Sequence, residues 1–170
     1  MTPEERIRTT EVMLVFDAAN VPTKRLFKLA KEALARGARV RAVVPVTAHL
    51  EKLLDLRQAK HAAYDGRKVR EALQDARVEI LPLDVDAAEV AAARLHTWFP
   101  NNDEWQAAKR ERLGLGGNAN APATIDWVTA AMCPEDAIVV TDDQGAEWGK
   151  CERMGSQELQ DVLAKLPPPP

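Results

Sequence analysis

Short apolar runs alternate with amphipathic segments along most of the chain. The runs that predict buried strands are residues 11–16, 40–45, 78–81 and 137–141, with a shorter one at 150–154. Between them, apolar residues recur at helical spacing and predict helices over 22–36, 47–60, 67–75, 86–95, 103–113, 126–132 and 157–166. Strands that alternate with helices favour a parallel arrangement with helices on both faces. We therefore predict an α/β fold built on a mostly parallel sheet of four to five strands.

Several predicted helices begin with a capping residue. Asn20 precedes the first of them, and Thr124 precedes the helix over 126–132. Asp86 followed by Glu89 has the spacing of a capping box. The glycine- and asparagine-rich stretch 114–122 predicts a loop.

The length of 170 residues suits one domain, which we place over residues 1–166, followed by a proline tail at 167–170. No apolar stretch approaches the roughly 20 residues that span a bilayer, and residues 1–6 lack the start of a signal peptide. We therefore expect a cytoplasmic protein with no membrane partner. Cys133 and Cys151 have neither disulfide nor zinc-site spacing, which favours their being small buried hydrophobes.

Four aspartates stand where predicted strands end or a helix begins. Asp17 follows the first apolar run, Asp126 opens a helix, and Asp142 and Asp143 follow the run 137–141. Each alone could cap a helix or open a turn. Together they would meet at the ligand-binding edge of the sheet, where crowded carboxylates need a cation such as Mg²⁺ or Mn²⁺. This arrangement predicts a metal-dependent phosphodiesterase.

Three of these segments also resemble a known family. Residues 15–20 (Val-Phe-Asp-Ala-Ala-Asn), 123–131 and 138–143 (Ile-Val-Val-Thr-Asp-Asp) are similar, in order and spacing, to the motifs of PIN-domain nucleases. The resemblance covers about residues 11–150. It implies a PIN-like domain and a Mg²⁺- or Mn²⁺-dependent endoribonuclease with an RNA substrate. Many members are toxins of toxin–antitoxin pairs similar to VapC, so an antitoxin partner and a homodimer are expected.

The resemblance also implies roles for individual residues. The acids that hold the metal match Asp17, Asp126 and Asp143, and some members carry a further acid at the position of Asp142. Thr141 matches a threonine that supports the site, and Asn20 is expected to support it as well. One departure is Ala19, where the family often has Asn or Ser.

A second departure concerns the second acid of the family, a glutamate just after the second strand. His49 stands at its position, and Glu51 lies two residues further on. The two differ by about 200° around a helix, so Glu51 faces the site only if the helix begins later than expected. His49 could serve as a ligand suited to Mn²⁺, or it could be a structural histidine. Both residues therefore stay candidates for the catalytic site.

The net charge of -3 conceals two basic groups. One contains Lys60, Arg67 and Lys68, and the other contains Lys109 and Arg110. Either group could bind RNA phosphates beside the acids, or it could be a solvated helix face. A tryptophan among Trp98, Trp105, Trp127 and Trp148 could stack on an RNA base, although tryptophans are more often core residues.

Two other classes remain open. A HAD-like phosphatase also begins with an aspartate after a strand, but it needs a second aspartate two residues later, where Ala19 stands. A PIN-like domain weakened in catalysis, as His49 could indicate, would bind RNA or a protein without cleaving. Metal-dependent cleavage of RNA separates the nuclease from this binding domain.

Overall fold

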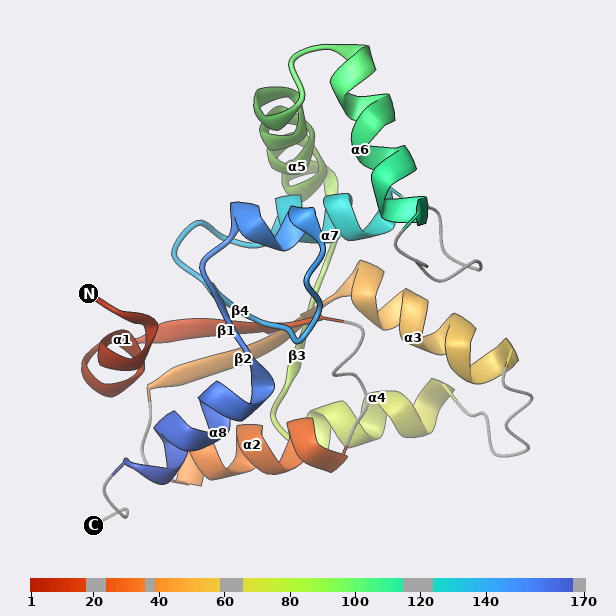
Figure 1. Cartoon of the computed structure of the whole chain (residues 1–170). Helices are drawn as coiled ribbons and strands as arrows, with labels where there is room; N and C mark the ends of the chain where they lie inside the picture. Colours follow the sequence, from red (N-terminus) through yellow and green to blue (C-terminus); the bar gives the residue numbers. More distant parts are fainter. Residues whose placement is uncertain (18–23, 36–38, 59–65, 115–123, 167–170) are drawn as a thin grey trace.

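A computed structural model describes residues 1–17, 24–35, 39–58, 66–114 and 124–166 (Figure 1). Five parallel strands form one sheet in the order β3-β2-β1-β4-β5. The strands are β1 (Val12–Phe16), β2 (Val40–Pro45), β3 (Glu79–Leu81), β4 (Ile138–Val140) and β5 (Arg153–Met154). The predicted α/β fold with a parallel sheet is confirmed. The predicted proline tail, residues 167–170, lies outside the described residues.

The central strands are apolar on both faces because helices cover both. In β1, Leu14 and Phe16 face one core cluster whereas Val15 faces the other, and each is 1% exposed. Ile138 and Val140 of β4 alternate with Val139 in the same way. Unbroken runs of apolar, β-branched residues are typical of parallel strands buried on both sides.

The first face of the sheet carries α2 (Lys24–Ala35), α4 (Gly66–Asp75) and α8 (Ser156–Ala164) (Figure 1). Leu73 of α4 and Leu159 and Leu163 of α8 are at most 1% exposed and pack against the strands there. Burying side chains of this size is the main source of stability, about 1.5–3 kcal/mol for each.

The second face carries α7 (Ile125–Met132) and the 3-10 helix η2 (Ala146–Lys150). The helix α5 (Val85–Trp98) packs on α7 rather than on the sheet, and α6 (Asn102–Gly114) extends beyond it (Figure 1). Phe99, which follows α5, holds this end together. Its ring centre lies 4.6 Å from that of Trp127, in an edge-on arrangement, and 5.2 Å from that of Trp105.

One helix that the apolar pattern did not predict is α1 (Pro3–Thr9). Its start carries a capping box between Thr2 and Glu5, with proline in the first turn. The guanidinium of Arg6 bonds to the carboxylate of Glu152 and to the carbonyl of Asp136. These two bonds join α1 to the segments that lead into β4 and β5.

One predicted cap was wrong, and a second holds its position without the capping hydrogen bond. The helix α5 is capped by the side chain of Asp84, which accepts from the N–H of Ala87 at 2.9 Å, so the helix begins before Asp86. Thr124 does stand at the start of α7, but its side chain makes no capping hydrogen bond. The remaining helix, α3 (Val46–Gln58), follows β2 with no intervening loop, one residue earlier than predicted.

Candidate functional site

The strand order reverses direction between β1 and β4. From β1 the chain builds β2 and β3 on one side, whereas β4 and β5 lie on the other. A reversal of this kind leaves a crevice outside the carboxyl ends of the two central strands, and ligands of open α/β sheets bind there. Asp17 follows β1, Thr141 follows β4, and Phe16 pairs with Val140 in the register. The structure thus brings these two predicted site residues to the predicted edge.

Thr141 is the centre of the hydrogen bonds at this edge. Its hydroxyl donates to the carboxylate of Asp17, which is only 4% exposed, and accepts from the N–H of Asp143 at 3.0 Å. The carboxylate of Asp143 in turn accepts from the N–H of Gly145 at 2.8 Å. The turn after β4 is therefore fixed by side-chain bonds, and two of the predicted acids are linked through one hydroxyl group.

Asp142 is directed elsewhere. Its two carboxylate oxygens accept hydrogen bonds from Ser156, one from the backbone N–H at 2.8 Å and one from the hydroxyl at 2.5 Å. Ser156 is the first residue of α8, so Asp142 binds the positive end of that helix. This geometry gives Asp142 a capping role and favours it less as a metal ligand.

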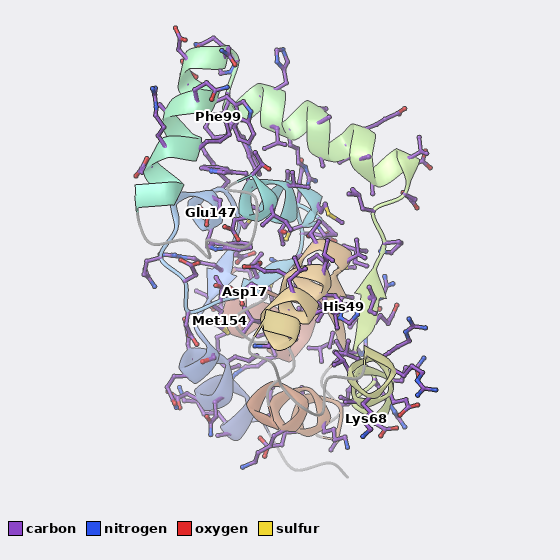
Figure 2. All side chains as sticks on the ribbon, turned by 90° about the vertical axis from the view of Figure 1, so that its right-hand side faces the viewer. Asp17, His49, Lys68, Phe99, Glu147 and Met154 are labelled. Atoms are coloured by element: carbon purple, nitrogen blue, oxygen red, sulfur yellow. The ribbon has the colours of Figure 1, made fainter. Side chains whose placement is uncertain are left out.

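The sequence reading missed one acid at this edge. Glu147 of η2 is fully buried, and its carboxylate lies so close to Gly145 that a Cβ at position 145 would overlap it. Figure 2 shows Glu147 and Asp17 on the same side of the molecule. A buried carboxylate is costly, which makes Glu147 a further candidate residue of the site. In the sequence, its spacing of four residues from Asp143 was the only signal.

Asp126 lies in the first turn of α7, where the helix dipole favours an acid. One turn further, the hydroxyl of Thr129 donates to the carbonyl of Ile125 at 2.7 Å and lies 2.6 Å from the hydroxyl of Thr47. Because Thr129 already donates to Ile125, Thr47 is the donor between the two threonines. This buried contact fixes α3 against α7.

The contact determines which residue of α3 faces Asp126. Residues four apart lie on one helix face, so Glu51 shares the face of Thr47. The two helices are antiparallel, because α3 continues outward from β2 whereas α7 leads back toward the start of β4 (Figure 1). Going forward along α3 from Thr47 to Glu51 therefore leads in the same direction as going backward along α7 from Thr129 to Asp126. This placement puts Glu51 and Asp126 on neighbouring turns of facing helices.

His49 faces the other way. Figure 2 shows His49 on the side of α3 away from Asp17. It is 8% exposed, and no described residue forms a hydrogen bond with its Nδ1 atom. Burial, together with the positive charge of Arg70 on α4, lowers the pKa of its imidazole. A neutral histidine beside an arginine, on the side of α3 away from Asp17, suits a structural role better than a catalytic one.

The basic residues lie on helices above and below these acids. Arg67 and Lys68 are exposed on α4, whereas Lys109 and Arg110 are on α6 (Figures 1 and 2). The ammonium of Lys109 lies 5.5 Å from the ring centre of Trp105, a cation–π contact that holds it locally. Lys60 and Asn20 lie outside the described residues.

The tryptophans have packing partners. Trp127 and Trp148 are 3% and 2% exposed, and Trp98 lies 6.3 Å from Trp127. Trp105 contacts Phe99. These contacts explain all four tryptophans as packing residues. None of them is therefore assigned a role in base stacking.

The donor set can be compared with the needs of a metal ion. Among the residues that the structure describes, no three His, Cys, Asp or Glu side chains form a group that could hold a metal by themselves. A closed site of zinc type, which needs three or four protein ligands, does not fit this arrangement. Mg²⁺ keeps several waters and is bound by one or two carboxylates plus substrate phosphates, and the linked pair Asp17 and Asp143 fits that requirement.

Comparison with known proteins gives no family for the chain. No protein-family model matches it, and no curated protein does. Within the described residues, no helix has the length and apolar character needed to cross a membrane.

Proposed function

We propose that the protein is a Mg²⁺- or Mn²⁺-dependent endoribonuclease of the PIN-like kind. The observation that carries the proposal is the linkage of Asp17 to Asp143 through the Thr141 hydroxyl at the switch point of a parallel sheet. Asp126 and Glu51 add two further acids from α7 and α3, on facing sides of one helix pair. The resemblance in the motifs around Asp17, Asp126 and Asp143 supports the same class.

The chain supplies binding and orientation for this reaction. A bound divalent ion supplies Lewis acidity and makes water a better nucleophile near neutral pH. Asp17 and Asp143 would hold the ion, and the Thr141 hydroxyl ties the carboxylate of Asp17 to the backbone of Asp143. Asp126 and Glu51 would complete its ligands or orient the attacking water. Exposed Arg67 and Lys68 would contribute attraction for the RNA backbone.

Single-stranded or loop RNA is the proposed substrate. A localised metal site must reach one phosphate, and sequence-specific RNA recognition mostly targets single strands and loops, whose bases are unstacked. The role of a toxin, with an antitoxin partner and a homodimeric state, belongs to this proposal through the resemblance alone. Co-expression with the product of the adjoining reading frame, followed by light scattering of the purified material, tests that part.

The test of the activity is cleavage of mixed single-stranded RNA with Mg²⁺, with Mn²⁺ and with a chelator. Asp126→Asn should abolish cleavage while the fold persists. Asp86→Asn is the matched control, because Asp86 is an exposed acid in the first turn of α5 and the change in charge is the same. Cleavage by Asp126→Asn at the rate of the unaltered protein would refute the site.

Metal binding can be tested independently of RNA. A ligand that binds only the folded state raises its stability, by about 2.7 kcal/mol at 100 times its Kd. Millimolar Mn²⁺ should therefore raise the melting temperature of the protein and of Asp86→Asn, and should raise that of Asp126→Asn less. A metal-dependent melting shift without cleavage would favour the RNA- or protein-binding alternative. Hydrolysis of small phosphomonoesters without RNA cleavage would favour the phosphatase.

A further inference from the structure

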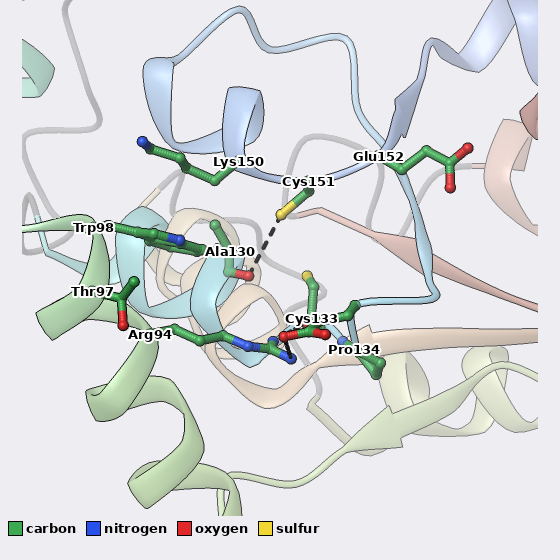
Figure 3. A pocket seen from close by; sticks show the side chains of 10 residues that line it. Arg94, Thr97, Trp98, Ala130, Cys133, Pro134, Lys150, Cys151 and Glu152 are labelled. Carbon is green, nitrogen blue, oxygen red and sulfur yellow. Dashed lines mark hydrogen bonds and ion pairs between the residues drawn. The ribbon is translucent and has the colours of Figure 1, made fainter.

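The two cysteines of the chain meet at the end of α7, on the amino side of the sheet. Cys133 directly follows α7, and Cys151 directly follows η2. The thiol of Cys133 donates to the carbonyl of Thr129 at 3.2 Å, and that of Cys151 to the carbonyl of Ala130 at 3.6 Å. Thr129 and Ala130 are consecutive in one helical turn, so the two sulfur atoms are held beside each other. Figure 3 shows both at the same pocket.

The pocket is large enough for a small molecule. Its volume is about 350 Å³, and Arg94, Trp98, Lys150 and both cysteines line it. Cys151 is half-buried and accessible from the pocket, whereas Cys133 is 3% exposed. Cys151 is therefore the thiol that a reagent from solution meets more readily.

The charges around the pocket favour the binding of an anionic small molecule. Arg94 bonds to the carbonyls of Ala131 and Cys133 and lies 3.6 Å from the exposed carboxylate of Glu135. The other lining carboxylate, Glu152, bonds to Arg6. Lys150 is exposed and has no carboxylate partner among the described residues, so it leaves a positive charge at the pocket.

The environment divides the chemical roles of the two thiols. The neighbouring Cys133 thiol, aided by the charge of Arg94, lowers the pKa of the Cys151 thiol. The neighbouring Cys151 thiol, together with burial, raises the pKa of Cys133 well above its ordinary value. The accessible thiol is thus the one that forms a thiolate more easily, as a nucleophilic cysteine requires.

We propose that Cys133 and Cys151 form a redox-active dithiol, which a low-molecular-weight disulfide bearing carboxylates oxidises to an intramolecular disulfide in this pocket. The Cys151 thiolate attacks one sulfur of the small disulfide, forms a mixed disulfide and releases one small thiolate. Cys133 loses its proton and attacks the sulfur of Cys151, and the second small thiolate leaves. The protein loses two protons and two electrons, and the small disulfide takes up the electrons to become two thiols.

The new bond would enclose a functional part of the chain. Residues 133–151 contain β4, Thr141, Asp143 and Glu147. A cross-link between the ends of this segment restricts it in the unfolded chain, so the oxidised protein should melt at a higher temperature. The proposal does not rest on nuclease activity, because thiol chemistry and melting are measured without RNA.

The test begins with the reduced full chain and oxidised glutathione. After incubation, the protein is denatured, alkylated with N-ethylmaleimide and weighed by mass spectrometry. The unaltered protein should become a monomer that lacks two hydrogens and takes up no alkylating groups. Cys133→Ser should stop at one glutathionyl group on Cys151, and Cys133→Ala repeats this measurement if the serine variant misfolds. Cys151→Ser should take up no glutathionyl group, because Cys133 is buried.

A second arm tests the pocket. Lys150→Gln should slow oxidation by oxidised glutathione about fivefold at low salt, the factor that corresponds to about 1 kcal/mol for one charge pair at 4 Å in water. The neutral bis(2-hydroxyethyl) disulfide should oxidise both proteins at equal rates. Lys28→Gln, an exposed change on α2, is the control that should leave both rates unchanged. Two alkylated thiols after oxidation, or a disulfide-linked dimer only, would overturn the dithiol. If Lys150→Gln slows oxidation by both disulfides equally, the proposal that the reagent is anionic is overturned.

Discussion

The hydroxyl of Thr141 donates a hydrogen bond to the carboxylate of Asp17 across the ends of β4 and β1. The two residues are far apart in sequence and adjacent in space, because the strands that carry them are neighbours at the switch point. Both are almost fully buried, at 3% and 4% exposure. A buried carboxylate depends on such donors for its stability, so Thr141 couples the stability of the fold to the geometry of the proposed site.

Thr141→Val should therefore destabilise the protein. Valine has the shape of threonine but lacks the hydroxyl, and the change removes the donor to Asp17 and the acceptor for the N–H of Asp143. Leaving a buried polar group without its partner costs about 1–3 kcal/mol. Urea unfolding of both proteins gives the difference directly, and RNA cleavage should fall in the same variant.

Thr141→Ser is the control, because it keeps the hydroxyl and loses one methyl group, worth about 0.8 kcal/mol at most for its buried area. It should retain most of the cleavage. If serine destabilises the protein and valine does not, packing of the methyl group matters and the hydrogen bond does not.

Asp142→Ala should cost stability without loss of cleavage. Its carboxylate binds the N–H and hydroxyl of Ser156 at the start of α8. Removing a capping side chain costs about 0.5–2 kcal/mol. Denaturant unfolding measures this loss, and an RNA assay at a temperature where the variant is folded measures activity. Loss of cleavage at full stability would restore Asp142 to the metal site.

The sequence is sufficient to predict the sheet, but it predicts only part of the site. Val15 and Val139 belong to apolar runs that only a strand covered on both faces can bury, so the parallel sheet follows from local patterns. The carboxyl edge follows as well, which brings Asp17 and Asp143 together. Local signals also fixed most helix positions to within a few residues.

The rest depends on tertiary contacts that no local pattern encodes. The rotation of α3 is set by the contact of Thr47 with Thr129, and for that reason the sequence alone could not decide between His49 and Glu51. Glu147 looks like a surface charge until the fold buries it. The two cysteines have unremarkable spacing and meet only because α7 and η2 pack together.

His49 should make stability depend on pH below neutrality. Its folded-state pKa is lowered by burial and by Arg70, whereas the unfolded chain has a pKa of about 6.5. As the pH falls below about 6.5, the unfolded chain binds a proton that the folded protein resists, so stability falls until the pH reaches the folded-state pKa. The free energy of unfolding, measured between pH 5 and 8, should show this loss.

His49→Leu should remove that part of the pH dependence because leucine does not titrate. The control is His96→Gln, which removes an exposed imidazole on α5 and should keep the fall in stability. A curve for His49→Leu parallel to that of the unaltered protein over this range would contradict the assignment.

The last prediction concerns the second acid of the proposed site. Glu51 shares the helix face of Thr47, which contacts α7 one turn from Asp126, whereas His49 lies toward Arg70. Glu51→Gln should therefore reduce RNA cleavage by roughly 10²-fold or more, as expected when a charged group that acts on the reaction is lost. Because glutamine keeps the size of glutamate, stability should change little. Single-turnover cleavage in Mg²⁺ measures the effect.

Two variants make this result specific to position. Glu71→Gln removes an exposed carboxylate from α4 and should cleave at the normal rate, which controls for a change in net charge. His49→Ala should still cleave with either ion under conditions where it is folded, since its side chain faces away from Asp17. If His49→Ala loses cleavage and Glu51→Gln keeps it, the histidine has replaced the acid of the family. In that case activity should favour Mn²⁺, because imidazole is a better ligand for transition metals than for Mg²⁺.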